Sequence, residues 1–288
     1  MKSINLLSHF HCTIRGQTFG HSLGHVLCKS LKNLGFTLKI KTLPLNKDPQ
    51  QLISDEDSAT IILCDPHILA CKKKLKSAGK VVLWNFEQNT LVRNKDKLDE
   101  ILKADYFDYV WHYTNNGFID NKKVFYMPCG YDDCMNGGSK KTHDLCFVGK
   151  LKGDRKKILD GLGKVYVMDK NNYNGLTDRL KNISKFRFSI FLPGTDDKEI
   201  LSYVPCQRIM LLYANDVLLF SNIKFNDILE EKHYVYFDGK KDFDEKHAYY
   251  AANEMERKKV VDEAKEYLKK KYLMSDLLKN VMAKSGIN

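Results

Sequence analysis

The sequence contains no long hydrophobic run. Its longest apolar stretch, residues 209–214, is far short of the roughly 18–20 residues that a membrane-spanning helix needs. Residues 1–9 hold only a short apolar stretch broken by Asn5, too little for the core of a signal sequence. We therefore expect residues 1–9 to contain a first strand, and the protein to have no transmembrane segment and to work in the cytoplasm.

Glycine and proline are scarce as well, at 17 and 6 residues, which excludes a collagen-like or low-complexity chain. The eight cysteines include no C-x-x-C pair and have no histidine at ligand spacing, so the sequence indicates neither a zinc site nor a disulfide framework. In contrast, 15 Phe, 15 Tyr and 2 Trp supply ample apolar surface for hydrophobic cores. A globular chain of 288 residues is most simply built as two domains.

The charge is positive and unevenly spread. The chain carries 47 Lys and Arg against 36 Asp and Glu, a net +11. Residues 1–50 carry +6, residues 151–200 carry +4 and residues 251–288 carry +3, whereas residues 201–250 carry −2. Such clustering favours an anionic partner, for example nucleotide phosphates, nucleic acid or an acidic glycan. The alternative is a lysine-rich surface that keeps the protein soluble.

Short β-rich runs alternate with helical patterns through the first 127 residues. The expected strands are residues 4–7, 37–42, 59–63, 81–84, 109–113 and 124–127, and the expected helices are residues 20–34, 67–76, 92–103 and 115–120. Strands that alternate with helices predict βαβ units and a parallel sheet. This half, residues 1–128, is therefore predicted to be a Rossmann-like α/β domain.

A second α/β half follows a break. Residues 129–138 are polar and turn-forming and predict a linker. Beyond them we expect strands at 144–149, 165–168, 186–192, 217–220 and 234–237, and helices at 152–162, 175–184, 203–214, 246–272 and 273–284. The second domain is predicted over residues 139–265. Two such domains facing a cleft would place ligands just after their strands, where open α/β sheets bind them.

The most informative strand end is at Gly149. It is followed by Lys152 and Arg155 in a basic segment that opens a helix. Glycine lets a ligand approach the backbone, and a helix N-terminus presents free N–H groups, so this segment favours phosphate binding over a merely solvated basic turn. There is no Walker A motif and no G-x-G-x-x-G, which excludes an ATPase P-loop and the dinucleotide fingerprint.

Two further segments are expected to contribute to the same site. The loop with Gly194, Thr195 and Asp196 follows a predicted strand and is expected to face the cleft. Arg208 falls early in the next helix, where its guanidinium can hold a phosphate through two parallel hydrogen bonds. The alternative is a simple turn and a surface arginine.

The first domain offers an acid and several polar groups at strand ends. Glu87, next to Asn85 and Gln88, follows a predicted strand and is a candidate general base or hydroxyl-binding group. Its alternative role is a helix cap or a surface ion pair. His9 and His11 lie on one side of the chain after the first strand and are expected to line the cleft rather than to bind zinc.

The D-F-D sequence at 242–244 matches the metal-binding D-x-D of some sugar transferases. It precedes the terminal helix instead of following a mid-chain strand. We therefore interpret these aspartates as charges that favour a helix N-terminus, and we predict no metal site.

Several of these pieces, in this order, resemble the GT-B class of glycosyltransferases. The likeness rests on W-N-F-E-Q at 84–88, Y-V-W-H-Y-T-N-N at 109–116, M-P-C-G-Y-D at 127–132, the strand and basic loop at 147–159, and R-I-x-x-L-x-A from Arg208. A looser likeness is to the T-even phage DNA glucosyltransferases. The resemblance covers most of the chain, although each piece is degenerate.

The resemblance implies a fold and roles for residues. Two Rossmann-like domains would face a cleft, and residues 266–288 would return to the first domain as a helix. Gly149, Lys152, Arg155 and Arg208 would contact the diphosphate of a UDP- or GDP-sugar, Glu87 would act as base, and no tightly bound cofactor or essential divalent metal is expected. The sequence departs from the pattern at Leu211, where the class has a ribose-binding Glu; Asp196, Asp197 and Glu199 are the alternatives.

We therefore expect a nucleotide-sugar-dependent glycosyltransferase acting on a glycan, lipid-linked or protein acceptor. Two other hypotheses stay open: a DNA-modifying glucosyltransferase, which the net charge of +11 favours, and a non-catalytic nucleotide- or sugar-binding module, which Leu211 favours. Peripheral contact with a membrane surface also stays open. The sequence does not decide between inversion and retention at the sugar.

Overall fold

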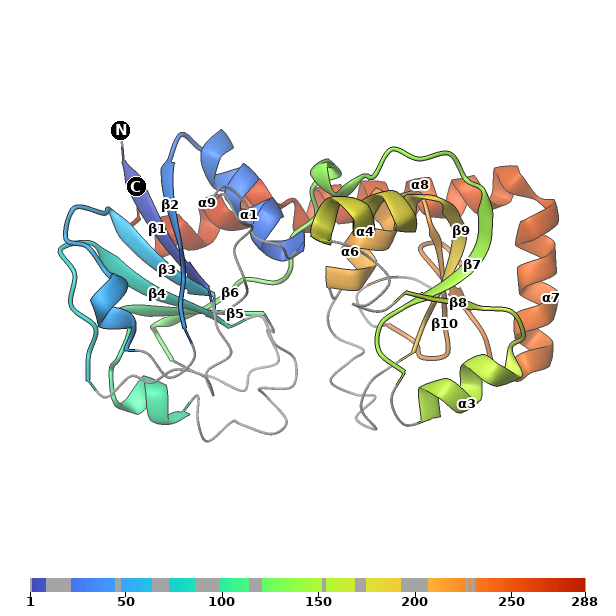
Figure 1. The fold of residues 1–288 in the computed structure, drawn as a ribbon, viewed down its shortest axis with the longest axis horizontal. Helices are drawn as coiled ribbons and strands as arrows, with labels where there is room; N and C mark the ends of the chain where they lie inside the picture. Colours follow the sequence, from blue (N-terminus) through green and yellow to red (C-terminus); the bar gives the residue numbers. More distant parts are fainter. Residues whose placement is uncertain are drawn as a thin grey trace. The chain divides into compact units, whose positions relative to one another are not determined.

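A computed structural model shows two compact units, Met1–Gly130 with Met274–Asn288, and Tyr131–Leu273. Each unit contains one parallel β-sheet (Figure 1). The structure describes residues 2–8, 22–44, 48–63, 73–85, 99–113, 121–151, 154–168, 175–192, 207–225, 228 and 231–287. Across these ranges, no helix has both the length and the apolar character of a membrane span.

The first unit is built on a six-stranded sheet in the order β2-β1-β3-β4-β5-β6. Its strands are β1 (Ser3–Ser8), β2 (Thr37–Thr42), β3 (Ala59–Leu63), β4 (Lys80–Asn85), β5 (Tyr109–His112) and β6 (Val124–Tyr126). β1, β3 and β4 are buried on both faces, as their largely apolar sequences favour. The strand order reverses between β1 and β3, and this reversal is the topological switch point of the sheet.

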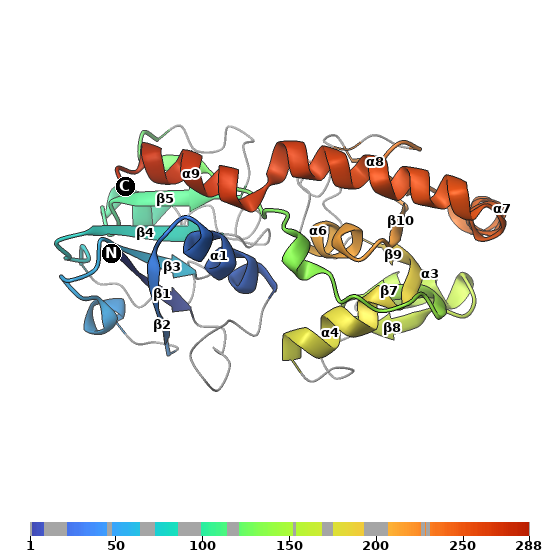
Figure 2. The ribbon, with the colours of Figure 1, turned by 90° about the horizontal axis from the view of Figure 1, so that it is seen from above.

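Different elements cover the two faces of this sheet. One face packs on residues 99–103, which are helical, through a cluster of Leu7, Leu43, Ile62, Leu75, Val81, Leu83, Ile101, Phe107 and Val110. Trp111, the neighbour of Val110, points to the opposite face because side chains alternate along a strand. There its indole Nε1 donates to Ser285 Oγ at 3.0 Å. That face carries α1 (Ser22–Asn33) and α9 (Met274–Lys284), which pack together (Figure 2).

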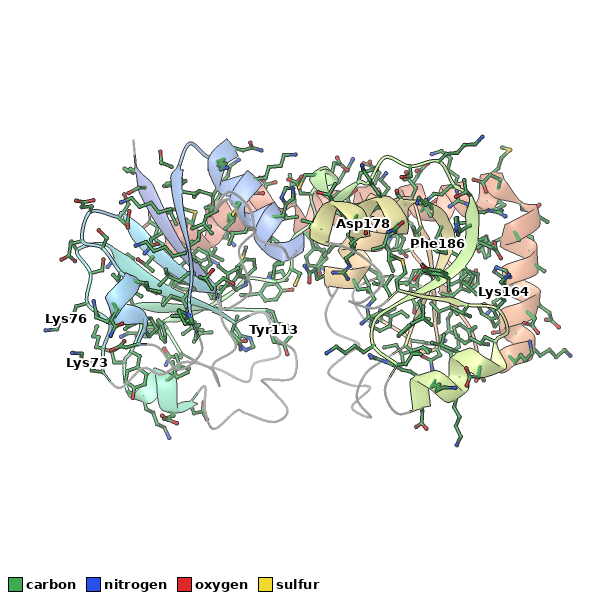
Figure 3. All side chains as sticks on the ribbon, in the orientation of Figure 1. Lys73, Lys76, Tyr113, Lys164, Asp178 and Phe186 are labelled. Carbon is green, nitrogen blue, oxygen red and sulfur yellow. The ribbon has the colours of Figure 1, made fainter. Side chains whose placement is uncertain are left out.

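One expected helix of this unit is partly wrong. Residues 73–76, the described end of the segment predicted as helix 67–76, are not helical. The reason is that the Leu75 N–H donates to Tyr106 O at 3.0 Å, a long-range bond that replaces a local helical one. Lys73 and Lys76 point away from the sheet on either side of the buried Leu75 (Figure 3). The expected helix at 115–120 lies outside the described residues.

The second unit is built on a five-stranded sheet in the order β11-β10-β9-β7-β8. Its strands are β7 (His143–Val148), β8 (Tyr166–Met168), β9 (Phe186–Phe191), β10 (Leu218–Ser221) and β11 (Val235–Tyr236). Its helices are α3 (Asp154–Gly161), α4 (Gly175–Ser184), α6 (Gln207–Ala214), α7 (Gly239–Ala252) and α8 (Glu254–Tyr272). The strand order reverses between β7 and β9.

The terminal helical region is not the single helix expected over 246–272. It begins earlier, at Gly239, and it breaks at Asn253, where φ is −113° and ψ is 76°. The Asn253 N–H closes α7 by donating to Tyr249 O, and the Arg257 N–H opens the new series by donating to Asn253 O. Neither glycine nor proline stands at this break, so the sequence carried no signal for it.

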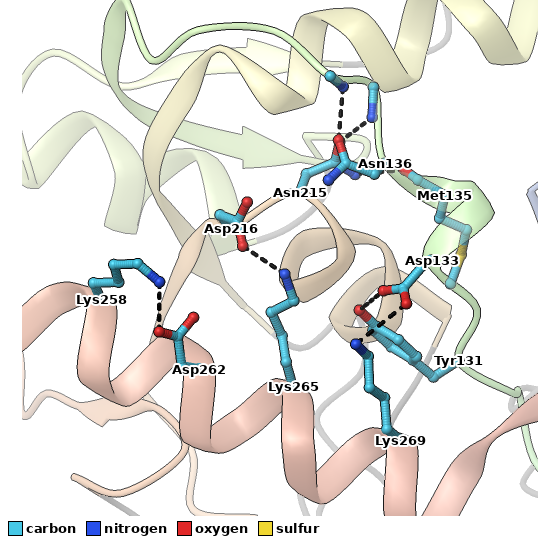
Figure 4. A network of polar contacts seen from close by, with 12 residues as sticks. Tyr131, Asp133, Met135, Asn136, Asn215, Asp216, Lys258, Asp262, Lys265 and Lys269 are labelled. Carbon is cyan, nitrogen blue, oxygen red and sulfur yellow. Dashed lines mark hydrogen bonds and ion pairs between the residues drawn. The ribbon is translucent and has the colours of Figure 1, made fainter.

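Residues 131–138, most of the segment predicted as a linker, pack within the second unit (Figure 4). The short 3₁₀ helix η3 (Asp133–Met135) lies there, and Met135 is buried. Asn215 fixes the segment, since its Nδ2 donates to Met135 O at 2.7 Å and its Oδ1 accepts from Gly137 N at 2.7 Å. Burial raises the pKa of the Tyr131 phenol, and the hydrogen bond that this phenol donates to Asp133 Oδ1 at 2.8 Å raises the pKa further.

Candidate functional site

The carboxyl edge of the second sheet brings together residues from three elements. Gly149 directly follows β7 and has a φ of +153°, a conformation that favours glycine. A Cβ atom built on it would lie 3.2 Å from Nη2 of Arg208 and 3.2 Å from Cζ of Phe147. Gly149 therefore lies against the Arg208 guanidinium, as expected if both residues serve one site.

Arg208 is the second residue of α6, and its position can be derived from the strand register. Its Cζ lies 5.7 Å from the ring centre of Phe147 and 5.2 Å from that of Phe191. Phe147 pairs with Ile190, so Phe147 and Phe191 point to opposite faces of the sheet. A group within reach of both rings has to lie at the edge where β7 and β9 end. That edge is the switch point, where ligands of such sheets bind.

Arg155 reaches the same place from α3. Its Cζ lies 5.7 Å from the centre of the Phe147 ring, and its Nη1 donates to Lys150 O at 3.1 Å. Because arginine stays charged at every physiological pH, two permanent positive charges flank one aromatic ring. Lys156, the next basic residue, is instead engaged with Asp160 at 2.6 Å.

The arrangement of these groups is chemically suited to an anion with several oxygens. Two guanidinium groups can each offer paired N–H donors to phosphate oxygens. The N-terminus of α3 adds its own partial positive charge near Arg155. Glycine at 149 keeps the backbone free of a side chain that would meet Arg208. The arrangement is suited to a diphosphate.

The first sheet also ends in buried polar residues. Asn85 is the last residue of β4 and His112 the last of β5; they are register partners and are 0% and 2% exposed. The His112 ring stacks on Tyr113 with ring centres 5.0 Å apart, and the Tyr113 N–H donates to Asn85 O at 3.1 Å. Tyr113 follows β5 directly (Figure 3). Asn85 was expected at this edge, whereas His112 was missed, although a polar residue closing an apolar strand was the signal.

Comparison with solved structures decides the fold. An α-glucosyltransferase in complex with UDP-glucose and DNA containing an abasic site superposes with a TM-score of 0.67 over 99% of both chains at 11% identity. T4 phage BGT in complex with UDP and Mn²⁺ gives 0.59 over 98% of this chain and 99% of that chain at 11% identity. A variant of S. aureus TarM, in complex with fondaparinux, α-GlcNAc-glycerol and UDP, gives 0.55 over 82% of this chain and 57% of that chain at 13% identity.

The chain has the GT-B fold. The two parallel sheets and the likeness over 99% of the chain confirm the fold class predicted from the sequence. The resemblance to GT-B glycosyltransferases is confirmed with it, at the level of structure. No protein-family model and no curated protein sequence matches this chain.

Most of the other predicted site residues lie outside the described part of this GT-B chain. They are Lys152, Gly194, Thr195 and Asp196 on the donor side, and His9, His11, Glu87 and Gln88 on the acceptor side. Glu87 and Gln88 come just after β4, which ends at Asn85, and His9 comes directly after β1.

At Leu211, where the GT-B pattern has a ribose-binding Glu, the structure shows a core residue. Leu211 is 0% exposed in α6, a helix whose residues from Ile209 to Ala214 are all buried. Its carbonyl accepts from Asn215 Nδ2 at 2.8 Å. A carboxylate at position 211 would be buried in the core. Position 211 therefore serves packing in this chain and not ribose binding.

The aspartates of the D-F-D sequence serve helix α7. Asp242 accepts from the Asp238 N–H at 2.9 Å, and this bond together with Lys246 holds the pKa of the Asp242 carboxyl below its usual value. Asp244 pairs with Lys240 at 2.7 Å. Both engage groups of their own helix and its entry, as interpreted from the sequence. Among the described residues, no three His, Cys, Asp or Glu side chains group in a way that could hold a metal ion.

Proposed function

We propose that this protein is a glycosyltransferase that uses a nucleoside-diphosphate sugar, of the UDP-glucose type, as donor. The observation that carries the proposal is the convergence of Arg155 and Arg208 on Phe147, beside Gly149, at the switch point of the second sheet. The solved structures with this fold that were compared above contain UDP or UDP-glucose, which supports the same donor here.

The two arginines would act on the leaving group. In the transfer, the oxygen of an acceptor hydroxyl bonds to C1 of the sugar while the bond from C1 to the diphosphate oxygen breaks. The electron pair of that bond goes to the diphosphate, whose charge rises, and fixed positive groups stabilise that charge most in the transition state. Lys152 and the loop with Gly194, Thr195 and Asp196 are proposed to complete this donor site.

The acceptor proton needs a destination too. If the sugar is transferred with inversion, we propose that Glu87 takes the proton. If it is transferred with retention, the proton goes to the diphosphate, and Glu87 binds the acceptor instead. The groups proposed to bind the acceptor are His9, His11, Asn85 and Gln88. They belong to an acceptor domain of residues 1–128, to which the segment 266–288 is proposed to return. Residues 139–265, after the linker 129–138, are proposed as the donor domain.

For the acceptor we favour DNA. The chain matches the α-glucosyltransferase that was solved with DNA over 99% of both chains, whereas it spans about 57% of the length of TarM. A net charge of +11 suits a polyanionic acceptor. The acceptor group would then be a hydroxyl carried by a modified base, since unmodified bases offer none.

A glycan, lipid-linked or protein acceptor is the second candidate. It is supported by the similarity to TarM over 82% of this chain, because the TarM complex holds the sugar derivative α-GlcNAc-glycerol. Both candidates share the donor site, so the donor is tested first.

A thermal-shift scan with UDP, GDP, dTDP, CMP and their sugars tests the donor. A ligand at about 100 times its Kd adds about 2.7 kcal/mol of stability, which raises Tm by a few degrees. We expect one nucleotide to raise Tm in the presence of EDTA, and we expect added Mn²⁺ not to change that rise. If the folded protein shows no shift with any of them, the proposal fails.

Transfer of labelled sugar then identifies the acceptor. DNA with hydroxymethylated bases should accept label, matched DNA without them should not, and the rate should fall steeply between 50 and 200 mM salt. Labelling of glycans or lipid-linked sugars, with DNA inert, would favour the second candidate.

A further inference from the structure

We propose that Phe147 is a positioning residue that sets the spacing of the two arginines at the diphosphate. The inference rests on the proposed function and deepens it. Phe147 touches all three described groups of the site: it lies within 6 Å of both guanidinium groups, and its Cζ and Cε1 face Gly149. None of the other described residues combines these three contacts.

The ring is held rigidly. Phe147 lies in β7, which pairs on one side with β8 and on the other with β9, through Val167 and Ile190. Its side chain is 0% exposed. A buried ring in a strand with neighbours on both sides has little freedom, so it is a fixed reference point for whatever packs on it.

A long arginine side chain is intrinsically less rigid than this ring, although Arg155 is also held by its donation to Lys150 O at 3.1 Å. Arg155 comes from the first turn of α3 and Arg208 from the first turn of α6, and a free arginine side chain samples many rotamers. The electron-rich faces of aromatic rings attract guanidinium groups and orient them. Contact with one shared ring therefore fixes both groups relative to each other before the donor arrives, which lowers the entropy lost on binding.

Phe191 supports only one of the two. Its ring centre lies 5.2 Å from Arg208 Cζ, and it packs edge-on against Phe225 at 5.3 Å. Phe147, in contrast, lies against Arg155 as well, with its ring centre 5.7 Å from Arg155 Cζ. Loss of Phe147 should therefore disturb both arginines, whereas loss of Phe191 should disturb Arg208 alone.

The variant Phe147→Leu tests the proposal, because leucine keeps the site apolar but has no ring face. Calorimetric titration of the full chain with UDP, UMP and uridine separates phosphate recognition from base recognition. We expect the affinity for UDP to fall about tenfold or more, the size expected when two arginine–ring contacts are lost, and the affinity for uridine to change less than about twofold. In the transfer assay KM for the donor should rise and kcat should fall.

Phe188→Leu is the matched control. Phe188 is also 0% exposed, lies in the adjacent strand β9 and carries an arginine, Arg187, at 5.0 Å. Near the amino end of the same sheet, it makes no described contact with the site. The variant should lose a comparable amount of stability and keep the wild-type ratio of UDP to uridine affinity.

Two results would overturn the inference. One is a folded Phe147→Leu protein with wild-type affinity for UDP; the other is an equal loss for UDP and uridine, which would mean a general structural effect. If Phe147→Leu does not fold, the affinity for UDP is compared between Phe147→Met and Phe191→Leu instead. The smaller loss of UDP affinity is then expected for Phe191→Leu. Failure of the wild-type chain to bind any nucleoside diphosphate would instead overturn the proposed function.

Discussion

Trp111 on β5 donates its indole hydrogen to Ser285, the residue that follows α9, at 3.0 Å. Ser285 is 0% exposed and passes the interaction on by donating to Val281 O at 2.7 Å. A sheet strand is thus tied to the far end of the chain by a chain of two buried hydrogen bonds. Trp84, the register partner of Trp111, is fixed in a similar way, since its Nε1 donates to Met127 O at 3.1 Å.

Ser285→Ala leaves the buried indole N–H without an acceptor, so we expect the free energy of unfolding to fall by about 1–3 kcal/mol. Trp111→Phe removes the donor instead, and the double variant should be less destabilised than the sum of the two single ones. Urea unfolding of the four proteins measures this coupling; additive effects would contradict the link.

Gly149 should not tolerate a side chain. At a φ of +153°, with Arg208 Nη2 3.2 Å from the added Cβ, Gly149→Ala should cost about 1–3 kcal/mol of stability and also displace the guanidinium. We therefore expect weaker UDP binding together with a lower Tm. Gly163→Ala is the control: its φ is +94°, but nothing lies within 4 Å of its Cβ position, so only Tm should fall.

Arg208→Ala should lower kcat/KM for the donor by roughly 10²–10³, the range seen when one group that stabilises a developing anion is removed. Arg208→Lys should recover only part of this, because a lysine lacks the planar pair of donors. Arg187→Ala removes an arginine near the opposite edge of the sheet, where it donates to Ala251 O at 2.7 Å, and should change stability alone. An unchanged kcat/KM for the donor in steady-state kinetics of Arg208→Ala would exclude this role.

Lys141 makes the stability of the second unit depend on pH. Burial lowers its pKa to about 8, although its Nζ donates to Phe186 O and Asn215 O. Between pH 8 and about 10.4 the folded state has lost this proton while the unfolded state still binds it. The contribution of Lys141 to the free energy of unfolding therefore rises with pH over that window and is lowest below pH 8.

Lys141→Met provides the measurement. The free energy of unfolding of the wild type, relative to this variant, should increase by roughly 1–3 kcal/mol from pH 7 to pH 10.4. Lys140→Met, which removes the exposed neighbouring lysine, should show a constant difference over the same range. A flat profile for Lys141→Met would show that Lys141 does not titrate in this window.

The sequence predicted the two sheets well, and it placed Gly149 and Arg208 in one candidate site, as the structure also does. Thr37–Thr42 and Ala59–Leu63 match the expected strands residue for residue; the first alternates polar and apolar residues, and the second is largely apolar. The proximity of Gly149 to Arg208 followed from the rule that parallel strands end at one edge. The position of Phe147 could not be predicted, since an aromatic residue in an apolar strand looks the same whether or not cations pack on it. The break at Asn253 had no local signal either, because long-range packing decides where α7 and α8 separate.

The last helix of the sequence, α9, belongs to the unit whose strands come first. During synthesis on the ribosome, the six strands of that unit emerge long before the helix that covers one of their faces. The whole second unit has to be translated in between. The apolar face of the first sheet must therefore stay partly uncovered until α9 has been synthesised. A fragment that stops before Met274 would expose this apolar face and should therefore be more prone to aggregation than the full chain.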